Sequence, residues 1–158
     1  MNWSRSKTKD LRRGGPLTRT RLLVAEGHIG MRERIVQMIE RDFDVVGVVG
    51  DGLALLEAAS RIKPNVCLMD ISLPLLCGIE AAIQLRELGS DSKVVFLTVD
   101  EDPDYVRAAL ATGALGYVLK SRMATDLCIA IKEAMAGRLF VSPSVPYVTQ
   151  NDKREDAK

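Results

Sequence analysis

Features typical of several protein classes are absent from this 158-residue chain. Its cysteines, Cys67, Cys77 and Cys128, are odd in number and form no CxxC pair, which predicts reduced thiols rather than a disulfide framework. His28 is the only histidine, so it has no imidazole partner for binding a metal. No Ser/His or Cys/His set suggests nucleophilic catalysis, and no Gly-x-Gly-x-x-Gly follows the first apolar run. These absences argue against an enzyme and against dinucleotide binding.

Long apolar runs are absent too. None approaches the ~20 residues that a membrane-spanning helix requires, and the basic N-terminus lacks the apolar segment of a secretory signal. We therefore expect a cytoplasmic protein without membrane contact. Hydrophobic residues make up 47% of the chain and charged residues 27%, a balance that predicts one globular domain with tails.

Charge is unevenly distributed along the chain. Residues 1–21 carry seven basic side chains and a single acid, Asp10, whereas the rest of the chain is net negative. We expect a disordered basic arm over residues 1–19, a folded unit over 20–137 and a linker or tail over 138–158. The composition of the arm leaves open a contact with nucleic acid or with an acidic partner.

Short apolar runs alternate with amphipathic stretches across the predicted folded unit. The runs are 22–25, 45–49, 66–69, 94–98 and 116–119. They are continuous rather than alternating in polarity, as in parallel strands covered on both faces. The alternation predicts an α/β fold with a doubly wound, five-stranded parallel sheet. We expect the flavodoxin-like strand order 2-1-3-4-5, although the pattern also leaves a Rossmann order open.

Local signals mark where helices should begin and end. Asp102-Pro103 is typical of an N-cap followed by proline in the first turn. Gly137 suits a left-handed cap after the last helix. Farther on, Ser142-Pro143 resembles a helix start, which Pro146 would interrupt within one turn.

Chemically active side chains occur where the predicted strands end. Asp70 directly follows the run 66–69 and precedes a turn that contains Pro74 and Gly78. The other strand ends carry Glu26, Thr98 and Lys120. Because the carboxyl ends of parallel strands meet at one edge of the sheet, we expect these side chains to converge. An acid, a hydroxyl and an amine around one aspartate predict a site for a phosphoryl group.

Together these motifs resemble the CheY-like receiver domain of two-component response regulators, over about residues 20–137. The resemblance is carried by 64–70 ending in Asp70, Leu73-Pro74, Gly78, Leu97-Thr98, and 113–120 ending in Lys120. His28, Lys120-Ser121 and the sequence from Gly137 to Ser142-Pro143 resemble the LuxR/NarL subtype, in which a helix-turn-helix output domain normally follows. No such pattern occurs here, so DNA contact is expected only through an output domain that this sequence lacks, whether truncated or lost.

The resemblance implies a phosphorylation switch. Asp70 would accept a phosphoryl group from a histidine kinase or a phosphotransfer protein. Lys120 and the Thr98 hydroxyl would contact the phosphoryl oxygens. Tyr117 would then turn inward, so that Thr98 and Tyr117 act as the switch residues.

The resemblance also implies a homodimer through the fourth helix, the fifth strand and the fifth helix. Its polar rim would include Tyr105, Arg107, Arg122, Asp126, Lys132 and Glu133. The alternative is that these residues are exposed helix residues with no role in an interface.

The expected metal site departs from the family pattern. The resemblance implies that Mg²⁺ would be held by Glu26, by Asp70 and by the backbone carbonyl of Ser72. The family usually has two adjacent acids after the first strand, but here the second position is Gly27. We therefore expect weak Mg²⁺ binding, partly offset by Glu26. The alternative is a pseudo-receiver, an interaction module that works without phosphate.

Overall fold

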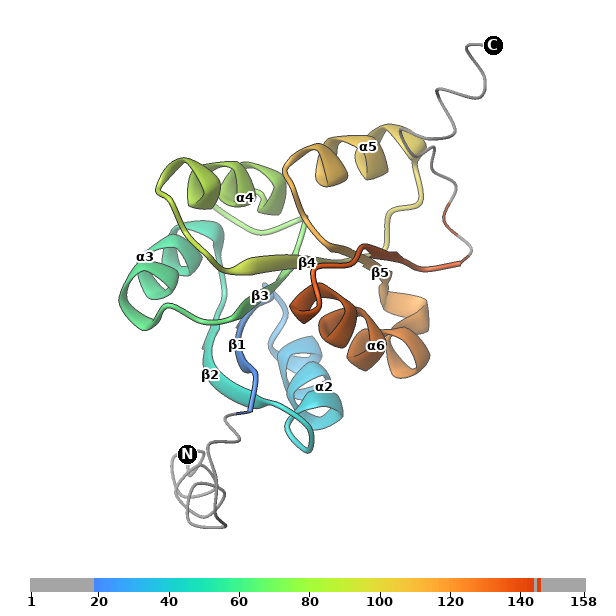
Figure 1. Ribbon diagram of the computed structural model, residues 1–158, viewed down its shortest axis with the longest axis horizontal. Helices are drawn as coiled ribbons and strands as arrows, with labels where there is room; N and C mark the ends of the chain where they lie inside the picture. The colour runs from blue at the N-terminus through green and yellow to red at the C-terminus, as the bar shows by residue number, and fades with distance from the viewer. Residues whose placement is uncertain (1–18, 144, 146–158) are drawn as a thin grey trace.

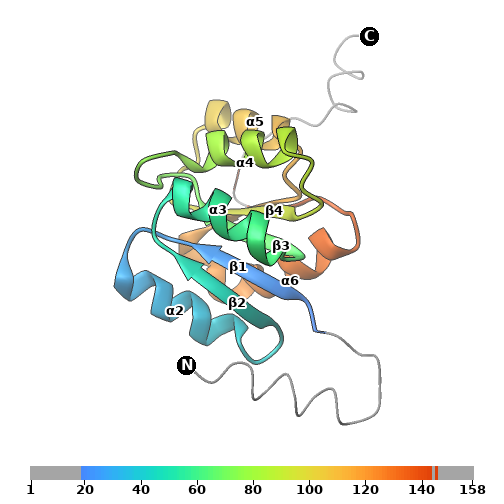
Figure 2. The same ribbon diagram turned by 90° about the vertical axis from the view of Figure 1, so that its left-hand side faces the viewer.

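The chain folds into a parallel sheet with helices on both faces (Figures 1 and 2). The structure is a computed structural model, and it describes residues 19–143 and 145. The strands are β1 (Arg21–Ala25), β2 (Asp44–Val49), β3 (Val66–Asp70), β4 (Lys93–Thr98), β5 (Gly116–Leu119) and β6 (Phe140–Val141). The helices are α2 (Ile29–Ile39), α3 (Gly52–Ile62), α4 (Gly78–Glu87), α5 (Pro103–Ala111) and α6 (Met123–Met135), with a 3-10 turn η1 (Lys120–Arg122) before α6.

The strand order is β2-β1-β3-β4-β5-β6, and every neighbouring pair is parallel. The prediction of a doubly wound sheet in the order 2-1-3-4-5 is therefore confirmed. The prediction of five strands is incomplete, because β6 adds a short sixth strand beside β5. Ser142 N donates to Tyr117 O at 2.9 Å and continues the pairing of β6. The helix start expected at Ser142-Pro143 and its interruption at Pro146 stay predictions, because Pro146 lies outside the described residues.

Two apolar layers explain the continuous apolar runs. On one face, residues such as Leu23, Cys67 and Met69 pack with α3, α4 and α5. On the other, Leu22 and Leu68 pack with α2 and α6. Figure 1 shows α3, α4 and α5 on one face of the sheet and α2 and α6 on the other. Fully burying one such aliphatic side chain stabilises the fold by about 1.5–3 kcal/mol, so these layers hold the strand ends in place.

Two helix signals in the sequence, Asp102-Pro103 and Gly137, are confirmed. Asp102 caps α5 by accepting a hydrogen bond from Asp104 N at 2.9 Å, and Pro103 occupies the first turn. Gly137 has a φ of 77°, the left-handed conformation expected after the last helix. Because all neighbouring strands are parallel, the helical connections return the chain to one edge of the sheet, and all strands end at the opposite, carboxyl edge.

Several predictions lie partly outside the described residues. The basic arm over residues 1–19 is described only at Arg19, so its disorder stays a prediction, as do the domain boundaries. All three cysteines are free. No helix in the described ranges is both long and apolar enough to cross a membrane.

Candidate functional site

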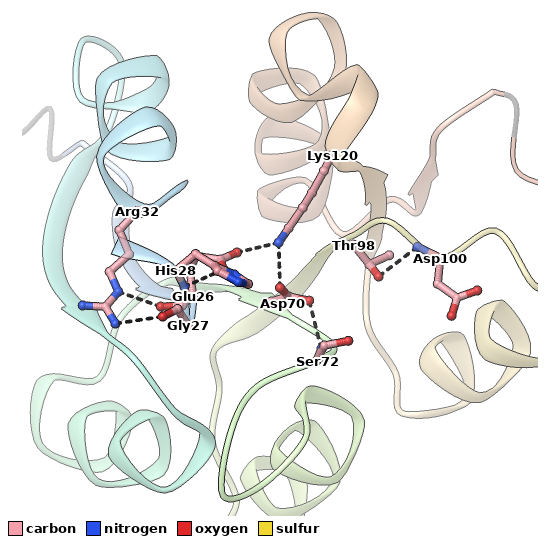
Figure 3. Close-up of polar contacts among 9 residues, drawn as sticks. All are labelled: Glu26, Gly27, His28, Arg32, Asp70, Ser72, Thr98, Asp100 and Lys120. Atoms are coloured by element: carbon pink, nitrogen blue, oxygen red, sulfur yellow. Dashed lines mark hydrogen bonds and ion pairs between the residues drawn. The ribbon is translucent and has the colours of Figure 1, made fainter. Parts of the chain in front are cut away.

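The predicted site residues converge at the carboxyl edge of the sheet (Figure 3). Glu26 directly follows β1, Asp70 ends β3, Thr98 ends β4 and Lys120 directly follows β5. Glu26, Asp70 and Thr98 are buried, with 1%, 6% and 1% of their surfaces exposed. Glu26, Asp70 and Lys120 thus form one largely buried cluster, whereas Thr98 lies beside it and bonds to Asp100 (Figure 3).

Lys120 bridges the carboxylates of this pocket. Its Nζ donates to Asp70 Oδ2 at 2.7 Å and forms an ion pair with Glu26 Oε1 at 2.8 Å. Burial lowers the pKa of Lys120, but hydrogen bonds and charge from Asp70 and Glu26 outweigh it and raise the pKa above its ordinary value of 10.5. Lys120 therefore stays charged and holds both acids.

Glu26 points into the pocket, as its longer side chain allows. Its Oε2 accepts a hydrogen bond from His28 N at 3.0 Å and lies 3.3 Å from His28 Nδ1. Burial raises the pKa of Glu26, yet the contacts with Lys120 and His28 lower it below 4.5 overall. Its Oε1 is buried and, although 2.8 Å from Lys120 Nζ, makes no hydrogen bond of good geometry. This oxygen is therefore already paired with the Lys120 ammonium.

A tight turn orients Asp70. Asp70 Oδ1 accepts a hydrogen bond from Ser72 N at 2.9 Å, while Gly78 N donates to Ile71 O at 2.7 Å. A Cβ on Gly78 would lie only 2.3 Å from Asp70 O, so the turn can close this tightly only with glycine there. The turn leaves Asp70 Oδ2 directed at Lys120.

Thr98 and Tyr117 both bond to Asp100. Thr98 Oγ1 accepts a hydrogen bond from Asp100 N at 3.2 Å, and Tyr117 OH donates to Asp100 O at 2.7 Å. The Tyr117 side chain is fully buried, and burial together with the nearby acids raises its pKa. Tyr117 is thus already turned inward. No side-chain pattern in the sequence signals this link, because it runs through the backbone N–H and carbonyl of Asp100.

The structure tests how well the pocket suits a metal ion. No group of three or more His, Cys, Asp or Glu side chains able to hold a metal occurs in the described part of the chain. Of the groups expected to bind Mg²⁺, the carboxylates of Glu26 and Asp70 lie together, with Oε1 and Oδ2 both against Lys120 Nζ. Gly27 adds no side-chain oxygen, and its carbonyl lies 3.3 Å from Arg32 Nη2. Two carboxylates, each already paired with an ammonium, are a sparse ligand set for a hard cation.

One residue of the expected dimer rim lies elsewhere. Asp126 is 4% exposed and accepts hydrogen bonds from Arg122 Nε at 2.9 Å and from Ser142 Oγ at 2.8 Å. The expectation of an exposed Asp126 is therefore wrong. Its helical position predicted exposure, but Ser142, directly after β6, bonds to its carboxylate.

A buried aspartate at the end of β3, with a lysine and an acid beside it on a 2-1-3-4-5 sheet, is the arrangement of a signalling receiver domain. The chain belongs to the response regulator receiver domain family, whose profile matches residues 22–132. It is thus a receiver domain of two-component response regulators, and such domains are signalling modules rather than enzymes. Receiver domains generally bind Mg²⁺ at the phosphorylation site.

Known relatives support this assignment. The chain is 34% identical over 128 residues to the transcriptional regulatory protein DegU of Brevibacillus brevis, covering 80% of this chain and 54% of DegU. It is 35% identical over 128 residues to the response regulator GacA of Pseudomonas viridiflava, covering 79% of this chain and 59% of GacA. The chain thus spans little more than half the length of these relatives.

Solved structures agree on the fold. A two-component response regulator of the LuxR family from Aurantimonas sp. SI85-9A1 is 27% identical, with a TM-score of 0.78 over 89% of this chain and 100% of that one. The signal receiver domain of NarL from Mycobacterium tuberculosis is 30% identical, with a TM-score of 0.73 over 76% of this chain and 98% of that one. The likeness to LuxR/NarL-type regulators predicted from the sequence is confirmed.

Proposed function

We propose that this receiver is a phosphorylation switch whose acceptor is Asp70. The observation that carries the proposal is the 2.7 Å contact between Lys120 Nζ and Asp70 Oδ2 inside a buried pocket. An ammonium held there can neutralise charge on an incoming phosphoryl group. A histidine kinase or phosphotransfer protein would be the donor.

The chemistry needs positioning more than covalent assistance. A carboxylate oxygen of Asp70 forms a bond to phosphorus as the P–N bond of a phosphohistidine breaks, and the imidazole leaves with the bonding pair. Glu26 keeps Lys120 within the pocket through the 2.8 Å ion pair. Ser72 N, donating at 2.9 Å, keeps the Asp70 carboxylate oriented.

Glu26, Asp70 and the Ser72 carbonyl would hold Mg²⁺, weakly because Gly27 supplies no carboxylate. When bound, the ion would add positive charge beside the phosphoryl oxygens. Lys120 supplies part of the same charge without a metal, since it already lies between Glu26 and Asp70.

Thr98 and Tyr117 would carry the signal away from Asp70. Thr98 would bond to the phosphoryl group through its hydroxyl, which now accepts from Asp100 N. That change would disturb the loop whose Asp100 carbonyl accepts the Tyr117 hydroxyl. The face formed by α5, β5 and α6 would respond, and a homodimer through this face is the assembly we propose. Regulation of DNA would require an output domain.

Incubation with acetyl phosphate and Mg²⁺, followed by intact-mass measurement, tests the acceptor. Wild-type protein should gain one phosphoryl group, and Asp70→Asn should gain none. Asp104→Asn, an exposed carboxylate in α5, is the matched control and should be modified like wild type. A phosphoryl group that persists in Asp70→Asn would refute the assignment of Asp70.

A second candidate function is a phosphate-independent interaction module. It is favoured by Gly27 and by the lack of a three-residue metal-binding group among the described residues. In that case neither wild type nor Gly27→Asp would take up phosphate at any Mg²⁺ concentration tested. Phosphorylation that appears only in Gly27→Asp would also favour the interaction module for the natural sequence.

A further inference from the structure

We infer that Ser142 is a positioning residue that ties the segment 140–143 to the end of β5, next to Lys120. Its suggested effect on phosphoryl transfer rests on the function proposed above. The physical link itself rests only on contacts within the described chain. This link couples the segment following α6 to the pocket around Asp70.

Ser142 bonds to two elements through three contacts. Its N donates to Tyr117 O at 2.9 Å, and its Oγ accepts from Leu119 N at 3.1 Å. The same hydroxyl donates to Asp126 Oδ2 of α6 at 2.8 Å. Ser142 is 1% exposed, so water cannot readily replace these bonds. The hydroxyl is therefore a buried junction between β5, β6 and α6.

Asp126, the second member of this junction, is linked to the turn that carries Lys120. Asp126 accepts from Arg122 Nε at 2.9 Å and from Thr125 Oγ1 at 3.1 Å. Arg122 ends η1, and Lys120 begins it. The turn that holds Lys120 is consequently anchored just before it, at Leu119, and just after it, at Arg122. Both anchors meet at the Ser142 and Asp126 side chains.

The segment that follows α6 is docked rather than loosely attached. Phe140 and Val141 pair with Gly116 and Tyr117. Val145 is 5% exposed and packs in the apolar layer that includes Tyr117. A shift of the Lys120 turn toward a phosphoryl group would therefore strain the bonds of Ser142. By thermodynamic linkage, loosening Ser142 should equally loosen Lys120.

A double-mutant cycle tests the link without phosphate. Urea unfolding is measured for wild type, Ser142→Ala, Lys120→Gln and the double variant. If Lys120→Gln does not fold, Lys120→Arg takes its place in the cycle. We expect Ser142→Ala to raise the unfolding constant about tenfold. The unfolding constant of the double variant should rise by about threefold or more less than the product of the increases in the two single variants. Additive effects would overturn the link.

Ser90→Ala is the matched control, because its hydroxyl also accepts from a backbone N–H, that of Ser92 at 3.1 Å, but at the amino edge of the sheet. It should be additive with the Lys120 variant. In a second arm, the initial rate of phosphorylation by acetyl phosphate should fall about three- to tenfold in Ser142→Ala and stay unchanged in Ser90→Ala. A non-additive cycle in a protein that takes up no phosphate would support the link and refute the proposed function. Unchanged phosphorylation in Ser142→Ala would refute the positioning role.

Discussion

Lys120 reaches across the carboxyl edge of the sheet to Glu26, placing Nζ 2.8 Å from Oε1 and 2.7 Å from Asp70 Oδ2. The three side chains carry a net negative charge, and at most 11% of each side chain is exposed. Lys120 is the cation that the structure places between the two acids (Figure 3). Its first role is therefore to make the pocket stable, and its proposed role in phosphoryl transfer uses the same charge.

Removing the charge of Lys120 should destabilise the fold strongly. Lys120→Gln leaves Glu26 and Asp70 buried together without their cation, and such loss of a buried partner costs about 3–5 kcal/mol. Asp70→Asn should cost less, because Lys120 keeps its ion pair with Glu26. Urea unfolding at pH 7 checks the order of the two variants. Lys120→Gln proving as stable as Asp70→Asn would contradict this account of the pocket.

The strands could be predicted from sequence because both faces of the sheet are covered. Each continuous apolar run therefore marks a strand, as β3 shows with all five of its residues buried. β6 could not be predicted this way. It has only two residues, and its place depends on backbone bonds such as Phe140 N to Leu115 O.

The candidate site was predictable in position but not in geometry. Spacing placed Glu26, Asp70, Thr98 and Lys120 at strand ends, and parallel strands bring those ends to one edge. Spacing does not specify side-chain torsions or backbone partners. The inward Glu26 and the bonds to Asp100 therefore became visible only in the folded chain.

Gly27→Asp should strengthen Mg²⁺ binding about tenfold or more, because it adds a carboxylate to a site that has few ligands. A Cβ there would lie 3.3 Å from Pro74 Cδ, so Pro74 needs to give only slightly. Isothermal titration with MgCl₂ measures the affinity. Gly30→Asp is the matched control, since its Cβ meets nothing within 4 Å and it adds the same charge nearby in α2. Equal affinities for the two variants and wild type would sink the prediction.

Tyr117→Phe should lower the free energy of unfolding by about 0.5–1.5 kcal/mol, the usual contribution of one hydrogen bond. The variant keeps the buried ring but loses the 2.7 Å bond to Asp100 O. Tyr105→Phe is the control, because Tyr105 is 47% exposed. Thermal unfolding compares the two. An effect no larger than that of Tyr105→Phe would mean that the Asp100 link does not stabilise the inward ring.

Asp126 should make stability depend on pH in the acid range. Burial raises its pKa, but hydrogen bonds from Arg122, Ser142 and Thr125, together with the charge of Arg122, lower it below the ordinary value of 3.8. A carboxyl whose pKa is lower in the folded chain stabilises the fold above its unfolded pKa and loses that effect as the pH falls through its folded pKa.

Asp126→Asn should therefore lower the free energy of unfolding by about 1–3 kcal/mol at pH 7, and its difference from wild type should shrink below about pH 4. Glu57→Gln, which removes an 80% exposed partner of Arg61, should match wild type at every pH. Urea unfolding from pH 7 to pH 3 measures these differences. A difference in unfolding free energy between Asp126→Asn and wild type that stays constant down to pH 3 would show that ionised Asp126 does not carry the stabilisation.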